Sequence, residues 1–144
     1  MYMFIFYFLG LFFMSANPTS LQGTSKLEVK ISNVRNSDGY VLVTLFNNER
    51  GFPDRTKYAF QNEKIKAEVH TTVVFEEIPY GTYAIAVLHD ENGNGVLDKN
   101  VVGIPIEGYG SSNNQKKLFR APNFDECKFS VDKETIKIDI SLNY

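Results

Sequence analysis

One short segment of the chain, residues 90–98, carries oxygen-bearing side chains at alternating positions. Its candidate ligands are the side chains of Asp90, Asn92, Asn94 and Asp98 and the main-chain carbonyl of Val96. This is the spacing with which a short loop surrounds a hard cation such as Ca²⁺, and Gly95 stands where such a loop must turn sharply. The segment therefore predicts a calcium site.

Two features distinguish this segment from the calcium loop of a helix-loop-helix site. It follows a β-strand pattern, and its twelfth position is Val101, where a bidentate glutamate is expected. Glu107 could supply the missing carboxylate if the chain folds back. The alternative is a metal-free turn, in which Asp and Asn side chains accept hydrogen bonds from nearby backbone N–H groups. The spacing favours the metal, and both interpretations stay open.

The same carboxylates allow an enzymatic interpretation. Glu107 paired with Asp90 or Asp98 could form the two acids of a secreted hydrolase that cleaves glycosidic bonds. Nothing else in the chain supports catalysis, because Cys127 lies on the same strand face as Phe129 and Val131, toward the core, and has no evident base partner. The two histidines lack further ligands nearby, so we expect no transition-metal site. We therefore predict a protein that is not an enzyme and has no catalytic residues.

Short alternating segments must position the candidate loop. We expect strands over residues 27–32, 40–46, 67–75, 82–89, 127–132 and 135–142. The second is apolar on both faces, as in a central strand, and we expect it to return antiparallel to the first. No sustained helical period follows the N-terminal region. The pattern predicts an all-β fold, an antiparallel β-sandwich of about seven strands, with one long loop that the acidic segment orders.

The N-terminal region differs from the rest of the chain, because residues 1–25 carry no charged side chain. Its apolar block, residues 3–14, is shorter than the roughly 18–20 residues that span a bilayer, but it matches the core of a signal peptide. No Lys or Arg precedes the block, so a retained membrane anchor is the alternative. We predict a signal peptide over residues 1–16, a linker over 17–25 and a single domain over 26–144, secreted or periplasmic.

Composition limits the classes of partner. The formal net charge is −2 over 144 residues, which predicts no basic surface for nucleic acid. A single cysteine excludes an intrachain disulfide, so an exported domain must be stabilised by core packing or by a metal. We expect a partner among the proteins, peptides or glycans of the cell envelope, and membrane contact only through the signal peptide.

Three blocks, residues 78–85, 89–98 and 103–110, resemble an uncharacterised bacterial family catalogued as domain of unknown function two-one-four-one. The resemblance extends over nearly everything after the linker. It implies an exported, single-domain protein with a sandwich similar to immunoglobulin-like or transthyretin-like modules. In the family an aromatic residue usually follows the third block, whereas this chain has Ser111. The resemblance implies no activity.

Together these observations predict an exported, non-enzymatic β-sandwich module whose long loop binds calcium and offers a binding surface. Two alternatives remain at this level: the hydrolase that uses Glu107, and a purely structural or accessory envelope module without a ligand. The arrangement of the side-chain oxygens of the loop distinguishes them.

Overall fold

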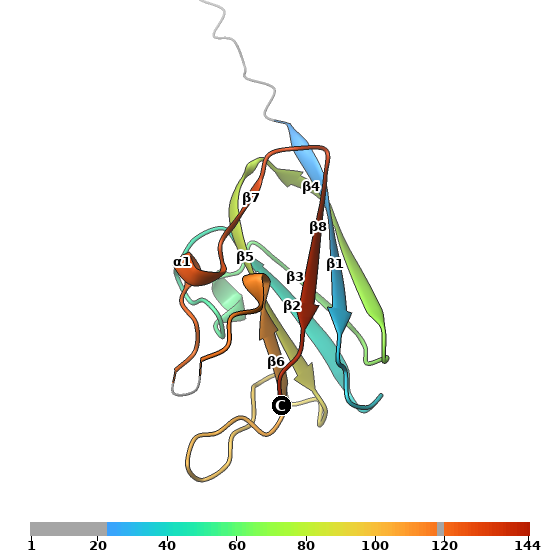
Figure 1. The fold of residues 1–144 in the computed structure, drawn as a ribbon, viewed down its shortest axis with the longest axis vertical. Coiled ribbons are helices and arrows are strands. Elements are labelled where there is room, and N and C mark those ends of the chain that lie inside the picture. The colour runs from blue at the N-terminus through green and yellow to red at the C-terminus, as the bar shows by residue number, and fades with distance from the viewer. Residues whose placement is uncertain (1–22, 118–119) are drawn as a thin grey trace, which may run out of the picture.

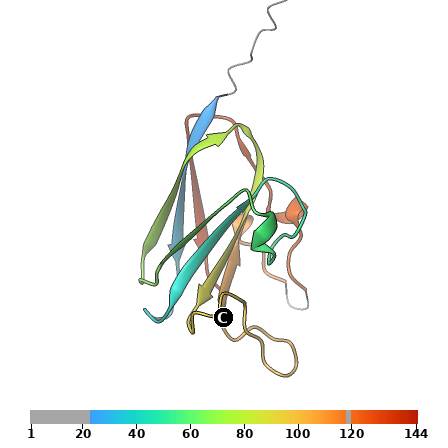
Figure 2. The same cartoon turned by 180° about the vertical axis from the view of Figure 1, so that it is seen from behind.

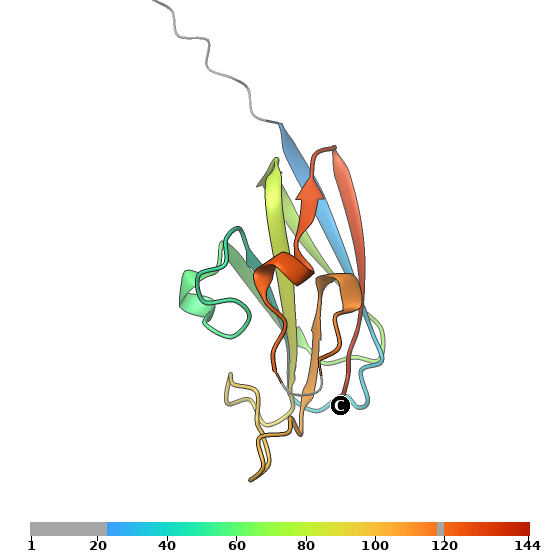
Figure 3. The same cartoon turned by 60° about the vertical axis from the view of Figure 1, so that its left-hand side comes forward.

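The computed structural model describes residues 23–117 and 120–144, which form two β-sheets packed against each other (Figures 1 and 3). The strands are β1 (Thr24–Ser32), β2 (Tyr40–Phe46), β3 (Gln61–Lys66), β4 (Thr71–Pro79), β5 (Gly81–Asp90), β6 (Gly108–Ser111), β7 (Phe129–Val131) and β8 (Thr135–Ser141). The only helices in the described part of the chain are one short α-helix and two 3-10 turns: η1 (Thr56–Tyr58), η2 (Ser112–Asn114) and α1 (Phe124–Cys127). The predicted all-β sandwich is confirmed.

The two sheets have different strand arrangements. The three-stranded sheet has the order β4-β1-β8, with β1 antiparallel to β4 and parallel to β8. The larger sheet has the order β3-β2-β5-β6, and β7 pairs with the first residues of β5. Consequently β1 and β2 lie in different sheets, and the expected antiparallel return of β2 onto β1 is wrong. Since both strands bury alternate residues in the same core, the apolar pattern does not reveal which sheet each one joins.

β2 is central, as its sequence predicts, because β3 and β5 flank it. β3 was not predicted, since Gln61–Lys66 is polar and exposed along most of its length and shows no apolar alternation. The strand expected over residues 67–75 begins only at Thr71. The strand expected over residues 127–132 is shortened to β7, because Cys127 ends α1.

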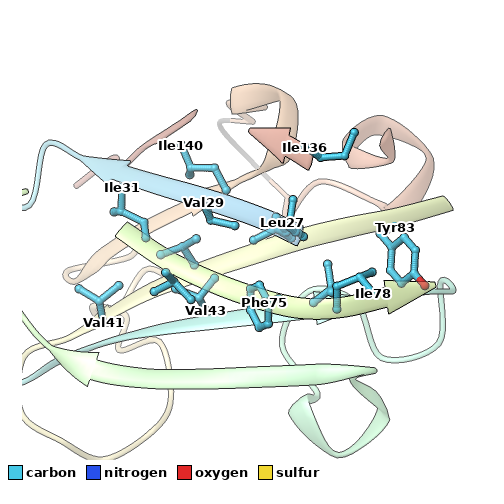
Figure 4. Packing of buried hydrophobic residues seen from close by; sticks show 14 of the residues in the cluster. Leu27, Val29, Ile31, Val41, Val43, Phe75, Ile78, Tyr83, Ile136 and Ile140 are labelled. Atoms are coloured by element: carbon cyan, nitrogen blue, oxygen red, sulfur yellow. The ribbon is translucent and has the colours of Figure 1, made fainter. Parts of the chain in front are cut away.

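The core lies between the sheets and is built from alternate residues of five long strands (Figure 4). Its main side chains are Leu27, Val29, Ile31, Val41, Val43, Leu45, Val73, Phe75, Ile78, Tyr83, Ile85, Val87, Ile136 and Ile140. The alternation places one residue in two on the inner face of each sheet, as expected for strands. Cys127 is fully buried, and this burial raises the pKa of its thiol. Ser111 is also buried, beside Cys127.

The predicted signal peptide and most of the predicted linker lie outside the described residues. β1 begins at Thr24, so the last two residues of that linker belong to the first strand. Within residues 23–117 and 120–144, no helix is long and apolar enough to cross a membrane. The start of β1 lies at the opposite end of the sandwich from the segment between β5 and β6 (Figures 1 and 2).

Candidate functional site

β5 positions the candidate loop. It pairs with β2 along its length, and Asp90 at its end lies opposite Tyr40. The chain then leaves the sheet over residues 91–107 and returns as β6, where Gly108 pairs with His89. Both ends of the long loop are therefore fixed as neighbours on adjacent strands, while the loop itself projects beyond the end of the sandwich (Figures 1 and 2).

Asp90 organises the first turn of the loop. Its side chain is fully buried, and its Oδ1 accepts hydrogen bonds from the backbone N–H groups of Gly93 and Asn94 at 2.9 and 3.0 Å. Its Oδ2 accepts from the N–H of Gly95 at 2.9 Å. Gly93 and Gly95 both have φ of +79°, a conformation that glycine adopts without steric cost. One carboxylate thus holds three consecutive amides in a tight turn.

Three of the other predicted ligands meet beside this turn. The Oδ1 atoms of Asn92 and Asn94 accept from the N–H groups of Asn94 and Val96 at 3.0 and 2.9 Å. Both amide groups donate to the carboxylate of Asp98, with Asn94 Nδ2 at 3.1 and 3.0 Å from its two oxygens. Val96 takes part through its N–H, and its side chain is exposed. The polar side chains of the loop therefore converge on Asp98.

Glu107 returns to this loop, which is the condition under which it could supply the missing carboxylate. Its Oε1 accepts from the N–H of Glu91 at 2.9 Å, and its Oε2 accepts from the N–H of Asp98 at 3.1 Å. The residue is only 4% exposed. Both oxygens are thus engaged by the backbone. No group of three or more His, Cys, Asp and Glu side chains in the described part of the chain is positioned to hold a metal ion.

An ion pair fixes the base of the loop. Arg35 Nε lies 2.7 Å from Glu91 Oε1, and Arg35 Nη2 donates to Glu91 Oε2 and to the carbonyl of Ile106, both at 3.0 Å. The guanidinium lowers the pKa of the Glu91 carboxyl. An open hollow of about 470 Å³ lies beside this pair, with Lys66 and Asp98 also in its wall. Its wall carries charges of both signs.

His89 also has a role that the sequence analysis did not identify. It is fully buried, with Nε2 2.9 Å from the carbonyl of Asp38 and Nδ1 2.8 Å from the hydroxyl of Tyr144. Because a carbonyl only accepts, Nε2 carries a proton, and in the neutral ring the Tyr144 hydroxyl then donates to Nδ1. That hydroxyl also accepts from the N–H of Arg35 at 3.0 Å. The partners of His89 are remote in sequence, so no local pattern could have indicated them.

Comparison with known proteins identifies the family without adding a function. No curated protein and no solved structure matches the chain. A family model described as an uncharacterized protein conserved in bacteria matches residues 29–139. The matched region contains the whole segment between β5 and β6, including the loop and Glu107. The chain therefore belongs to this bacterial family, DUF2141.

Proposed function

We propose that this protein is an exported, non-enzymatic β-sandwich module in which the loop over residues 90–98 binds Ca²⁺ and orders a binding surface. The observation that carries the proposal is the convergence of Asn92, Asn94 and Asp98 beside the turn that Asp90 holds. Each Asn carbonyl has a second lone pair, so it can accept a backbone N–H and still face a cation. The Asp98 carboxylate would hold Ca²⁺ in place of the two Nδ2 groups that donate to it here, and Asn92 and Asn94 would turn their carbonyl oxygens toward the ion.

The geometry of the carboxylates favours a binding module over the hydrolase. A general acid or base needs an oxygen that can reach substrate and exchange a proton. Both oxygens of Glu107 accept backbone N–H groups, and those of Asp90 accept three. These contacts hold the loop together, and because Asp90 is fully buried and Glu107 is only 4% exposed, neither carboxylate is open to a substrate. The accessory module without a ligand is the remaining alternative, and it predicts no response to Ca²⁺.

Melting curves with chelator and with millimolar Ca²⁺ test the proposal. The few carboxylates in the loop point to a dissociation constant on the order of 10⁻⁴–10⁻³ M. A tenfold excess of Ca²⁺ then stabilises the fold by about 1.4 kcal/mol, which corresponds to an increase in Tm of roughly 3–8 °C. Magnesium should raise Tm less, because it requires stricter octahedral geometry.

The matched variants are Asp98→Asn and Asp132→Asn. Both remove one negative charge, but Asp132 is exposed and lies between β7 and β8, away from the loop. Asp98→Asn should abolish the Ca²⁺-dependent increase in Tm, and Asp132→Asn should preserve it. If the melting curves of the unaltered protein with chelator and with Ca²⁺ superimpose, the loop is the metal-free turn.

Export is part of the proposal, and the fold is compatible with it. A cut after Ala16 removes no residue of β1, which begins at Thr24. We expect the mature chain to begin between about residues 17 and 23. The intact mass of protein isolated from its native cells measures this directly. A full-length mass that includes Met1 would contradict the prediction.

A further inference from the structure

The loop ends in a cluster of aliphatic side chains exposed to solvent. We call Val101, Val102 and Ile104 the aliphatic tip; they are 105%, 73% and 58% exposed. Among the described residues, ten large hydrophobic side chains are exposed, and five of them fall within residues 96–106. Single exposed apolar residues are ordinary on a protein surface, but a contiguous group indicates a site of interaction.

Most backbone N–H groups of residues 101–106 are bonded within this turn or at its base. Asn100 Oδ1 accepts from the N–H groups of Val102 and Ile104, both at 3.0 Å. The N–H of Asn100 donates to the carbonyl of Ile104 at 2.8 Å, and that of Gly103 donates to the carbonyl of Asn100 at 2.9 Å. Pro105 has no N–H. The tip is therefore a built turn that directs most of its donors inward and its hydrocarbon side chains outward.

The base of the tip is fixed to the rest of the domain. The N–H of Ile106 donates to the carbonyl of Asp98 at 2.9 Å, and Arg35 Nη2 donates to the carbonyl of Ile106 at 3.0 Å. Lys99 and Pro105 form an antiparallel bridge across the neck of the turn. The segment projects past the end of both sheets, at the end opposite the start of β1 (Figures 1 and 2).

We infer that the aliphatic tip inserts into the surface of a lipid bilayer. A stable protein interface uses about 20–30 residues on each side and is anchored by aromatic or arginine side chains. The segment that carries the aliphatic tip, residues 101–106, has no side chain that can form a hydrogen bond. A second copy of this chain, docked tip to tip, would bury too little surface, because three side chains are far fewer than a stable interface needs.

Hydrocarbon, in contrast, offers no hydrogen bonds and penalises every unsatisfied backbone group. A point of branched aliphatic side chains, with most of its N–H groups bonded internally, suits shallow insertion at the bilayer surface, where the outer carbonyls keep their contact with water. Lys99, one residue before Asn100, is exposed at the neck and can reach lipid phosphates. This partner differs from the envelope protein, peptide or glycan expected from sequence. The inference rests on the proposed function only in that this loop is the binding surface, and it does not require the metal.

Sedimentation with phosphatidylcholine vesicles, in chelator, tests the inference on the mature chain as isolated from cells. The unaltered protein should pellet with the vesicles at both low and high salt, because the aliphatic tip binds without net charge. Ile104→Asp should reduce the partition coefficient about tenfold or more. Val69→Asp is the matched control, since Val69 is 59% exposed and lies between β3 and β4; it should change the partition little.

A fluorescence measurement locates the contact. The chain has no tryptophan, so Val101→Trp places a single probe at the tip and Val69→Trp places one elsewhere. Adding vesicles should shift the emission of the first to shorter wavelength and leave the second unchanged. No shift at position 101, release of the unaltered protein by salt, or an equal loss with Val69→Asp would overturn the inference. The inference would also be overturned if the protein captured an envelope protein through Ile104 and did not bind vesicles.

The two proposals fail separately. Ile104→Asp should retain the Ca²⁺-dependent increase in Tm, because Ile104 makes no side-chain contribution to the candidate ligands. If the unaltered protein does not bind vesicles but still shows the Ca²⁺-dependent increase in Tm, the lipid inference alone is rejected. If the protein binds vesicles but Ca²⁺ does not raise its Tm, the calcium proposal alone is rejected.

Discussion

Replacing Asp90 with alanine should lower the free energy of unfolding, measured in chelator, by about 2–4 kcal/mol. The carboxylate is fully buried and accepts three backbone N–H groups. Each hydrogen bond to a charged group is worth about 1.5–3 kcal/mol, but the freed amides belong to exposed residues and recover part of this from water. Urea unfolding measures the change, with an unaltered slope if only stability is affected.

Asp90→Asn and Asp132→Ala are the controls. The Asn variant keeps one acceptor oxygen in place for Gly93 and Asn94 and loses the acceptor for Gly95, so it should be destabilised by less than the Ala variant. Asp132 is exposed, and its replacement should have an effect within about 0.5 kcal/mol. If Asp90→Ala were no more destabilising than Asp132→Ala, the loop would not be organised around Asp90.

Phe75→Ala should destabilise the protein by about 3–5 kcal/mol. Phe75 is 2% exposed and lies on the inner face of β4, against the side chains of the opposing sheet (Figure 4). Its truncation removes apolar burial and leaves a cavity that the two sheets cannot close without distorting strand pairing.

The preceding residue provides a matched control for Phe75. Val74 belongs to the same strand but faces outward and is 39% exposed. Val74→Ala should therefore cost about 1 kcal/mol or less. Thermal and urea unfolding both report the difference. Equal losses for the two variants would mean that the inner face of β4 is not packed as described. The Ca²⁺-dependent increase in Tm should survive in both, since neither touches the loop.

The fold was predictable where its determinants are local. The alternation over residues 135–142 gave β8, with Ile136 and Ile140 buried, and the apolar character of residues 40–46 gave a central strand. β3 escaped prediction because an exposed edge strand needs no apolar face and Gln61–Lys66 has almost none. The pairing of β1 with β8 was not predictable either, since nothing local connects strands at opposite ends of the chain.

The candidate site divides in the same way. The sequence by itself determined the turn over residues 90–98, because an Asp or Asn side chain reaches amides only two to five residues away. It also indicated that Glu107 could return to the loop. Only the tertiary structure decided that both oxygens of Glu107 bind backbone amides, because β6 must first pair with β5 to bring them there. The network of Arg35, His89 and Tyr144 likewise joins groups as far as 109 residues apart in the sequence. The exposure of the aliphatic tip was also decided by the tertiary structure, because it depends on which surfaces the rest of the fold leaves uncovered.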